Sequence, residues 1–334
     1  MTYTKKEYKY VDTQSIKLTE MIHEEYQYLE LIERILKTGS LETTRNGTTK
    51  SVFGNMMRFT LRDGTLPLLT TKQVAWKTCF KELMWFVSGN TNNYELNKQD
   101  VHIWDANCTR TFLDSRGLTD YESDDELGPI YGWQWRQFNK PYYSKTEKAY
   151  QQAIASSVID EDMNLQPLTN NNDGIDQLQQ IIDALKDPNQ RTSRRLIMSA
   201  WNPCQLGQMA LPPCHILCQF NVRDGKYLSC ALYQRSGDVG LGVPFNIASY
   251  SFLTHILAKH CGLEADEFVY FLGNAHIYES HIEPLKTQLE RVPYEFPKLE
   301  IKQTHLDIEN YTLDDIEWPS KYVYHPSIKM EMVA

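Results

Sequence analysis

One long apolar segment constrains the fold of this 334-residue chain more than any other feature. Residues 246–259 have helical length and are mostly apolar, so a helix here must be buried on most of its sides. Strand-like segments occur before and after it, at residues 195–201, 215–222, 227–234 and 268–272. A buried helix among several strands is typical of an α/β domain, and we predict that fold class.

The rest of the chain adds helices and one more strand to this pattern. Apolar side chains at helical spacing predict helices over residues 21–38, 76–88 and 175–185, which end close to Gly39, Gly89 and Pro188. Residues 51–61 alternate between apolar and polar side chains and precede Asp63-Gly64, which predicts a strand and a turn.

The chain is predicted to form one domain. No linker rich in Gly, Ser or Pro divides residues 21–334, and residues 1–20 are expected to be an N-terminal extension. Residues 144–174 are polar and lack sustained periodicity, so they are expected to form a surface insertion.

Composition excludes several classes of protein. No run of eighteen apolar residues and no secretory signal is present, and the seven cysteines form no regular framework, so we expect a cytoplasmic protein. The net charge of −9 argues against broad binding to nucleic-acid phosphates. An anionic substrate must therefore be bound by a few local arginines.

The segment Leu211-Pro212-Pro213-Cys214-His215 is a candidate nucleophilic site. The thiolate is the reactive form of cysteine, and the nearby Arg235 is expected to lower the pKa of Cys214. A lone cysteine is more often a small buried apolar residue, and period-two alternation places Cys218 on the same strand face. The two prolines and Arg235 favour Cys214.

Two other uses of these residue types are weaker. A protease-like Cys-His pair is disfavoured because Cys214 and His215 are adjacent in a strand and point to opposite faces, so His215 is interpreted as a wall or water-network residue. No metal site is predicted, because there is no Cys-x-x-Cys pair and His255 and His260 lie on different faces of a helix.

Glu82 has apolar helical neighbours, including Phe86. Desolvation raises the pKa of a carboxyl group, so Glu82 is a candidate proton-handling residue, although a half-exposed glutamate on a helix flank is the commoner case. Arg194 and Arg195 begin a predicted strand, where adjacent side chains point to opposite sides. Both can bind one anion only across a partner surface or from a twisted loop.

Asn246 precedes the apolar run, where asparagine is normally a helix N-cap, but its amide also offers a donor and an acceptor to a ring edge. Asp238 lies among Gly237, Gly240 and Gly242, which allow a ligand to approach closely or form a turn. These glycines do not form a phosphate-loop pattern.

Taken together, these segments closely resemble the folate-dependent thymidylate synthase family, in its eukaryotic or large-DNA-virus form, over about residues 22–334. The matching stretches are Thr70-Thr71-Lys72, Glu82-Leu83-Met84-Trp85-Phe86, Val101-His102-Ile103-Trp104-Asp105, Gly128-Pro129-Ile130-Tyr131-Gly132, Ser193-Arg194-Arg195, the Cys214 segment, residues 233–250 and His276-Ile277-Tyr278. The resemblance implies a mixed twisted sheet covered by helices, with the sheets of two subunits packed back to back in a homodimer.

The resemblance also implies a reaction. Cys214 would add to carbon 6 of the uracil ring of dUMP, so that carbon 5 attacks 5,10-methylenetetrahydrofolate. Hydride transfer from the folate would then complete the methyl group and give dTMP and dihydrofolate. The folate is both carbon donor and reductant, so neither a nicotinamide nor a metal is required.

The implied site residues fall into three sets. The catalytic set is Cys214, Glu82, Tyr131, His215, Arg235, Asp238 and Asn246. The dUMP-binding set is Arg45, Arg194, Arg195, Gln234, Arg235, Ser236, Asp238, Asn246, His276 and Tyr278, with Arg194 and Arg195 supplied by the other subunit. The folate-binding set is Lys72, Ile103, Trp104, Asn107, Asp238, Leu241, Gly242, Phe245, Tyr278, Met332, Val333 and Ala334.

The apolar C-terminal tail, residues 328–334, would close over the bound ligands. One segment departs from the family pattern: the arginine loop at residues 45–50 is one residue shorter than usual and poorer in glycine. A pyrimidine-nucleotide hydroxymethylase is the nearest alternative, but relatives that act on cytosine tend to carry Asp at the position of Asn246. An auxiliary RNA-binding role is the second alternative, and the negative net charge opposes it.

Overall fold

The computed structural model describes residues 23–44, 47–121, 125–143 and 173–333. The predicted N-terminal extension, Arg45, Ala334 and nearly all of the predicted insertion lie outside these residues. None of the helices in the described part of the chain is long and apolar enough to cross a membrane.

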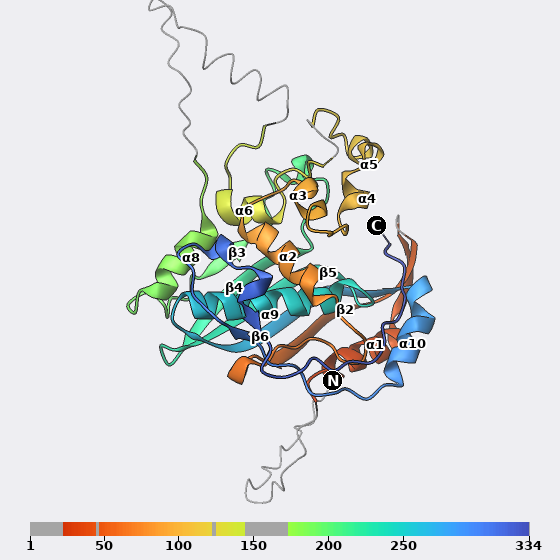
Figure 1. The fold of residues 1–334 in the computed structure, drawn as a ribbon. Helices are drawn as coiled ribbons and strands as arrows, with labels where there is room; N and C mark the ends of the chain where they lie inside the picture. Colours follow the sequence, from red (N-terminus) through yellow and green to blue (C-terminus); the bar gives the residue numbers. More distant parts are fainter. Residues whose placement is uncertain (1–22, 45–46, 122–124, 144–172, 334) are drawn as a thin grey trace, which may run out of the picture.

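A six-stranded mixed sheet is the centre of the fold (Figure 1). Its strands, in spatial order, are β1 (Ser40–Thr44), β2 (Gly47–Thr60), β6 (Glu264–Tyr278), β5 (Tyr227–Asp238), β4 (His215–Arg223) and β3 (Ile197–Ser199). Only β5 and β6 are parallel, and every other neighbouring pair is antiparallel. The predicted α/β class with a mixed sheet is confirmed.

The α-helices of the described residues are α1 (Tyr26–Thr38), α2 (Trp76–Val87), α3 (Asn93–Asn97), α4 (Asp105–Cys108), α5 (Arg110–Ser115), α6 (Tyr131–Gln137), α8 (Gln177–Lys186), α9 (Gly242–His260) and α10 (Ile282–Leu289). Short 3-10 turns are η2 (Arg62–Gly64), η3 (Leu206–Gln208), η4 (Glu279–His281), η5 (Ile308–Asn310) and η6 (Leu313–Asp315). A second, two-stranded sheet pairs β7 (Glu300–Ile301) with β8 (Ile316–Glu317).

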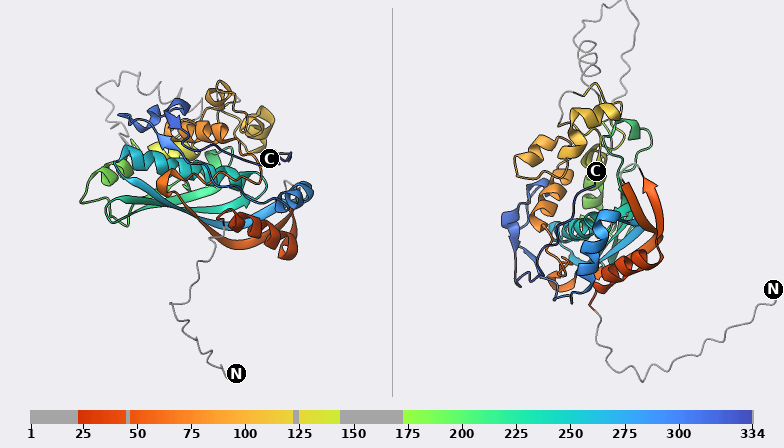
Figure 2. Two further views of the ribbon diagram at one scale, coloured as in Figure 1. Left: turned by 60° about the horizontal axis from the view of Figure 1, so that its bottom comes forward. Right: turned by 90° about the vertical axis from the view of Figure 1, so that its right-hand side faces the viewer.

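The apolar helix α9 explains this arrangement. Parallel strands need a crossover connection, and α9 is the crossover between β5 and β6. Sixteen of its side chains are buried, among them Ile247, Phe252 and Leu257, because β5 and β6 cover one side of the helix and α2 covers another. In Figure 2, α2, α6 and α9 lie on one side of the sheet, and α1 lies at one end of it.

Most predicted element boundaries agree with the structure within a few residues. Helix α1 ends before Gly39 as expected, and the turn at Asp63 and Gly64 is formed with both residues at positive φ. Helix α2 ends at Val87, one residue before the predicted end at Ser88, and Gly89 follows with a φ of 74°. A side chain at Gly89 would be strained and would also meet Arg136, so glycine is required to end α2 here.

Several predicted strands change length, and β2 begins at Gly47 instead of residue 51. Strand β6 has fifteen residues where the sequence predicted five at 268–272, and β5 continues to Asp238. Strand β3 has only three residues and begins at Ile197 instead of residue 195. The long β5 and β6 carry the candidate site residues 234–238 and 276–278 toward one end of the sheet.

The other face of the sheet carries an unusual row of apolar side chains. Leu217, Tyr233, Phe271 and Met56 are direct cross-strand partners on β4, β5, β6 and β2, and each is between 36 and 50% exposed. Phe53 on the same strand as Met56 is 82% exposed. A shallow hollow of about 370 Å³ lies along part of this row.

Candidate active site

Cys214 immediately precedes β4 and is partly exposed. Its backbone N–H donates a hydrogen bond to the hydroxyl of Tyr131 at 2.8 Å. Its carbonyl oxygen accepts a hydrogen bond from the backbone N–H of Arg235 at 2.9 Å. The start of α6 and the strand β5 therefore fix the backbone of Cys214 from two sides.

Arg235 holds the turn that presents Cys214. Its Nε donates to the carbonyl of Pro213 at 2.9 Å, and its Nη2 donates to the carbonyl of Pro212 at 3.0 Å. The guanidinium carbon also lies 5.7 Å from the centre of the Trp201 ring, a cation–π contact. The groups that hold Arg235 beside the thiol are therefore all neutral. None of these contacts is a carboxylate that would compensate the positive charge of the guanidinium.

The pKa of Cys214 differs from the sequence-based expectation. Burial raises this pKa and the positive charge of Arg235 lowers it, but burial is the larger effect and the pKa is raised overall. The expectation of a lowered pKa is therefore wrong in its net direction, because sequence spacing gives no measure of desolvation. The contribution expected from Arg235 is present.

The structure separates Cys214 from its competitor Cys218. A β-bulge between His215 and Leu217 interrupts the period-two alternation on which their equivalence was based. Cys218 is only 1% exposed, and a hydrogen bond with Cys230 and burial raise its pKa well above the ordinary value. Cys214 is partly exposed and has the positive charge of Arg235 beside it, and Cys218 has neither, so Cys214 is the better nucleophile.

Glu82 is buried on α2 with an exposed fraction of 7%. Burial raises the pKa of its carboxyl group from 4.5 to about 7, and a hydrogen bond from Trp104 opposes this effect. The indole Nε1 of Trp104 donates to Oε1 of Glu82 at 2.8 Å. The predicted raised pKa is confirmed, and a carboxyl group that titrates near neutrality suits proton transfer.

His215 forms a neutral wall beside Cys214. Its ring lies 4.9 Å from the ring of Tyr131 and 5.4 Å from the ring of Tyr250. Burial lowers the pKa of His215 to about 4, and a hydrogen bond with the Asn246 side chain opposes the shift. Its Nδ1 is buried and has no hydrogen-bond partner among the described residues. A neutral imidazole with a free nitrogen fits the expected water-network role.

Asn246 is not a helix N-cap. Helix α9 begins at Gly242 with Leu241 as its N-cap, so Asn246 lies in the second turn of the helix and is buried. The helix therefore begins four residues before Asn246, earlier than the N-cap preference of asparagine predicts, in the segment that contains Gly242. The Asn246 side chain points toward His215, consistent with a role beside a ring.

The nucleotide-binding candidates on β5 and β6 are brought together by the sheet register. Asp238 pairs with His276, and Ser236 pairs with Asn274. Gln234 is buried, and both polar atoms of its amide are hydrogen-bonded: Oε1 accepts from the Tyr270 hydroxyl at 2.5 Å and Nε2 donates to the Ser236 carbonyl at 2.8 Å. Gln234 therefore positions the strand that carries Arg235 and Ser236.

Arg194 and Arg195 lie in a turn before β3, not in the strand predicted at residue 195. The alternation argument does not apply to a turn, and both residues are exposed. Among the described residues, no hydrogen bond or ion pair joins either arginine to Cys214 or Arg235. Arg45 lies outside the described residues.

Among the folate-binding candidates, Lys72 lies close to Asp238. Lys72 is buried, and its Nζ donates a hydrogen bond to the Gly240 carbonyl. Burial lowers the pKa of Lys72 to about 8, although the charge of Asp238 opposes the shift. The remaining members of this set are buried or partly buried, apart from the tail residue Met332: Ile103, Trp104, Asn107, Leu241, Gly242, Phe245, Tyr278 and Val333.

The C-terminal segment packs on the molecule instead of fraying. The hydroxyl of Tyr322 donates to the Leu69 carbonyl at 2.6 Å, and the backbone N–H of His325 donates to the Thr70 carbonyl at 2.7 Å. Met330 packs against the core, and the Glu331 carbonyl is bonded to His281 at 2.7 Å. Both figures show the C-terminal end on the α10 side of the molecule (Figures 1 and 2).

Several residues of this region were missed by sequence reasoning. Tyr270 bonds Gln234, Trp201 contacts Arg235, and His281 lies between Asp238 and the tail. The only sequence feature that could have indicated a site role for His281 is its position five residues after His276. The aromatic residues carried none, because most of the 39 aromatic side chains in such a chain are core residues.

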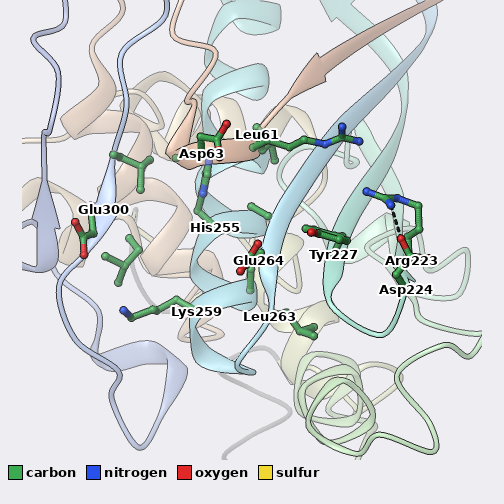
Figure 3. A pocket seen from close by; sticks show the side chains of 16 residues that line it. Leu61, Asp63, Arg223, Asp224, Tyr227, His255, Lys259, Leu263, Glu264 and Glu300 are labelled. Carbon is green, nitrogen blue, oxygen red and sulfur yellow. Dashed lines mark hydrogen bonds and ion pairs between the residues drawn. The ribbon is translucent and has the colours of Figure 1, made fainter.

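A separate pocket of about 740 Å³ lies at the opposite end of β5 (Figure 3). It is lined by residues that include Tyr227, His255 and Lys259. Tyr227 precedes Gln234 by seven strand residues, roughly 23 Å of strand, so this pocket is remote from Cys214. Its arginines Arg62 and Arg223 both pair with Asp266.

Groups of three or more metal-ligating side chains are absent from the described residues. The site therefore consists of a positioned thiol, a carboxyl group of pKa about 7, a neutral histidine and an amide, next to a strand end that carries Asp238 and His276.

Comparisons with known proteins give a consistent result. The family model described as thymidylate synthase matches residues 26–334. The thymidylate synthase of Homo sapiens is 49% identical over 314 residues, which cover 93% of this chain and 91% of that protein. The thymidylate synthase of Human herpesvirus 8 type P is 48% identical over 313 residues, covering 93% of this chain and 85% of that protein. The bifunctional dihydrofolate reductase-thymidylate synthase of Leishmania amazonensis is 51% identical, but the chain spans only 56% of its length.

Proposed function

Because the chain belongs to the thymidylate synthase family, we propose that it catalyses the reductive methylation of dUMP to dTMP, with 5,10-methylenetetrahydrofolate as cosubstrate and dihydrofolate as second product. One observation carries this proposal: Cys214 is fixed by Tyr131 and Arg235 in the same site as a carboxyl group, Glu82, whose pKa is about 7. The names of the relatives favour the synthase over a hydroxymethylase.

In the first step the Cys214 thiolate forms a bond to carbon 6 of the uracil ring. Burial favours the thiol, so the thiolate depends on the neighbouring charge of Arg235. The two proline carbonyls keep this guanidinium in place without neutralising it. A phosphate group of the substrate would also contact Arg235, together with Ser236 on the same strand.

Asn246 and His215 would recognise and polarise the ring. An amide offers both a donor and an acceptor, which matches the N3–H and O4 edge of uracil. Asn246 is held by α9 and by His215, so its orientation is set before the substrate binds. His215 stays neutral at physiological pH and can order water near O4, since its pKa is about 4.

Glu82 would handle protons during the addition and the later loss of the carbon 5 proton. Its pKa near 7 allows both protonation states at physiological pH. Tyr131 connects Glu82 to the nucleophile, because its hydroxyl bonds the Cys214 backbone and its ring contacts Trp104 at 6.1 Å. The folate, when bound, supplies the one-carbon unit and the hydride.

The described geometry supports the proposed folate site beside this machinery. Trp104 bonds Glu82 and lies on the α4 side of the site, and Asp238 is the carboxylate at the end of β5. Lys72 and the segment that begins α9 lie next to Asp238. A polar pterin ring has groups that a carboxylate can accept from, and the indole of Trp104 offers a flat apolar surface.

We further propose that the active form is a homodimer. The row formed by Leu217, Tyr233, Phe271 and Met56 gives the open sheet face an apolar surface that crosses four strands. Exposed apolar patches of this kind mark protein interfaces, and a second copy of the same face is complementary to it. A charge placed on this row, as in Phe271→Asp, should convert the dimer to monomers in sedimentation velocity experiments.

The exposed turn with Arg194 and Arg195 borders the same face at β3, which supports the proposal that the partner supplies these arginines to the phosphate. Two inactive variants, Cys214→Ser and Arg195→Ala, provide a test. Mixed heterodimers would contain one site with both residues intact and should regain activity. No activity in a mixture with proven subunit exchange would contradict the shared site.

The activity itself is tested with purified protein, dUMP and 5,10-methylenetetrahydrofolate. We expect dihydrofolate absorbance to rise in step with dTMP. Formation of hydroxymethyl-dUMP without dihydrofolate would instead identify the hydroxymethylase alternative. An auxiliary RNA-binding role stays a prediction, and a salt-dependent titration with RNA would test it. The net charge of −9 predicts that any such binding is weak.

A further inference from the structure

His281 lies between the candidate site and the C-terminal tail. It is completely buried in η4, directly before α10. Its Nε2 is 2.7 Å from the backbone carbonyl oxygen of Glu331, and its Nδ1 is 3.4 Å from Oδ1 of Asp238. One side chain therefore touches both the tail and the carboxylate at the end of β5.

Gly240 makes this close arrangement possible. A Cβ atom at this position would lie 2.5 Å from Nδ1 of His281 and 3.1 Å from Sδ of Met330. The backbone N–H of Gly240 also donates to Oδ1 of Asp238 at 2.8 Å, and its carbonyl accepts from Lys72. Asp238, His281 and the tail thus meet at a glycine, where the backbone leaves room for all three.

We propose that His281 is a positioning residue that couples docking of the C-terminal tail to ligand contact at Asp238. This inference rests on the proposed function, because it assumes that the folate is the ligand of Asp238. The C-terminal segment is otherwise held by Met330 and by hydrogen bonds of Tyr322, Tyr324, His325 and Pro326, and none of these bonds is made to Asp238.

The chemistry of an imidazole explains the coupling. The carbonyl of Glu331 can only accept, so Nε2 must carry the proton of that bond. In a neutral ring Nδ1 would then turn a lone pair toward the Asp238 carboxylate, which is unfavourable at 3.4 Å. A second proton on Nδ1 removes this repulsion and strengthens the donor at Nε2.

The groups around His281 are consistent with this protonation. Burial lowers the pKa of His281, but Asp238 and the Glu331 carbonyl together raise it by more, so the pKa is raised overall despite the charge of Lys72. The other titratable groups that face it are His276, whose own pKa is lowered, and Tyr278, whose ring lies 5.6 Å away. Asp238 is therefore the one carboxylate among these groups.

The direction of the coupling follows from the Asp238 carboxylate. Gly240 and His281 both lie on its Oδ1 side, which leaves Oδ2 for a ligand. A ligand that donates to Oδ2 stops rotation of the carboxylate and keeps Oδ1 facing His281. The tail should then dock more firmly, and by reciprocity a docked tail should increase folate affinity by the same factor.

Carboxypeptidase Y digestion of the full chain, followed by intact mass spectrometry, measures the fraction of undocked tail. Wild-type protein should lose its C-terminal residues more slowly when dUMP and tetrahydrofolate, a pair that does not react, are added. In His281→Leu the tail should be released roughly tenfold faster without ligands, the effect of losing one charge-assisted hydrogen bond. The slowing by ligands should be absent from this variant.

Two further variants separate coupling from simple anchoring. His281→Gln keeps a neutral donor for the Glu331 carbonyl but no second nitrogen facing Asp238, so basal release should rise less than in His281→Leu while the ligand effect is lost. His255→Gln is the matched control, since His255 is also buried and bonds a backbone carbonyl, that of Thr65 at 2.9 Å, far from the tail. It should change neither rate.

The proposal is overturned if folded His281→Leu protein shows wild-type release rates and a wild-type response to ligands. If His281→Leu does not fold, Gly240→Ala displaces the same ring and should give the same release. Failure of the proposed function has a different signature: wild-type protein would then produce no dihydrofolate, while the difference between His281 variants in basal tail release would persist.

Discussion

Glu82→Gln gives the most quantitative prediction from this structure. The carboxyl group of Glu82 is buried on α2 among apolar side chains and accepts one hydrogen bond, from Trp104. A glutamine has nearly the same shape and can accept the same bond, but it does not titrate. The variant therefore removes the charge of Glu82 without opening a cavity.

The magnitude follows from the pKa of Glu82, which is raised by burial from 4.5 to about 7. Between these values the folded chain keeps a proton that the unfolded chain has lost. The free energy of unfolding therefore falls as pH rises through this window, by about 3 kcal/mol in total. About 2.5 kcal/mol of this decrease in unfolding free energy is expected between pH 5 and pH 8. The decrease should be absent from Glu82→Gln, whose glutamine does not titrate.

Urea denaturation of wild-type protein and Glu82→Gln at several pH values measures this difference. The advantage of the variant in unfolding free energy should grow by about 2.5 kcal/mol from pH 5 to pH 8, while other titrating groups cancel in the comparison. The variant should also lose roughly a hundredfold or more in kcat, because it cannot transfer protons. A difference in stability that does not change with pH would refute the reasoning about burial.

Three more predictions concern the neighbours of Cys214 and Glu82. Trp104→Phe removes the hydrogen bond that lowers the pKa of Glu82, so the limb of the pH–rate profile controlled by Glu82 should move to higher pH; an unmoved limb would exclude this link. Tyr131→Phe leaves the Cys214 N–H without its acceptor and should cost about 1–3 kcal/mol of unfolding free energy, measured by thermal denaturation, with a lower kcat. Deletion of residues 331–334 should abolish turnover and preserve dUMP binding in calorimetry, and retained turnover would disprove the closing role of the tail.

The sequence predicted those parts of the fold that depend on local pattern. The apolar run 246–259 correctly required a helix that is buried on most sides, and α9 has that environment between the sheet and α2. The apolar neighbours of Glu82 correctly indicated a raised pKa. In both cases the side chains that decide the outcome are close in sequence.

The sequence-based predictions were wrong where contacts between segments that are distant in sequence determine the local structure or the pKa. Helix α9 begins at Gly242, and Val243 and Pro244 of its first turn are buried, so Asn246 lies inside the helix. The bulge at His215 breaks an alternation that sequence alone assumes to be regular. Desolvation of Cys214 comes from surroundings that no spacing reveals, and it outweighs the charge of Arg235. His281 gains its meaning only from contacts with Asp238 and Glu331, which lie 43 and 50 residues away.

The central claim is that Cys214, and not Cys218, attacks the pyrimidine ring. Release of deuterium from 5-deuterated dUMP in the presence of 5,10-methylenetetrahydrofolate reports this attack directly, because carbon 5 gives up its hydrogen only after carbon 6 has been attacked. Wild-type protein and a folded Cys218→Ser variant should release deuterium, and Cys214→Ser should release none above the uncatalysed rate. Release by Cys214→Ser at a rate close to wild type would contradict the account.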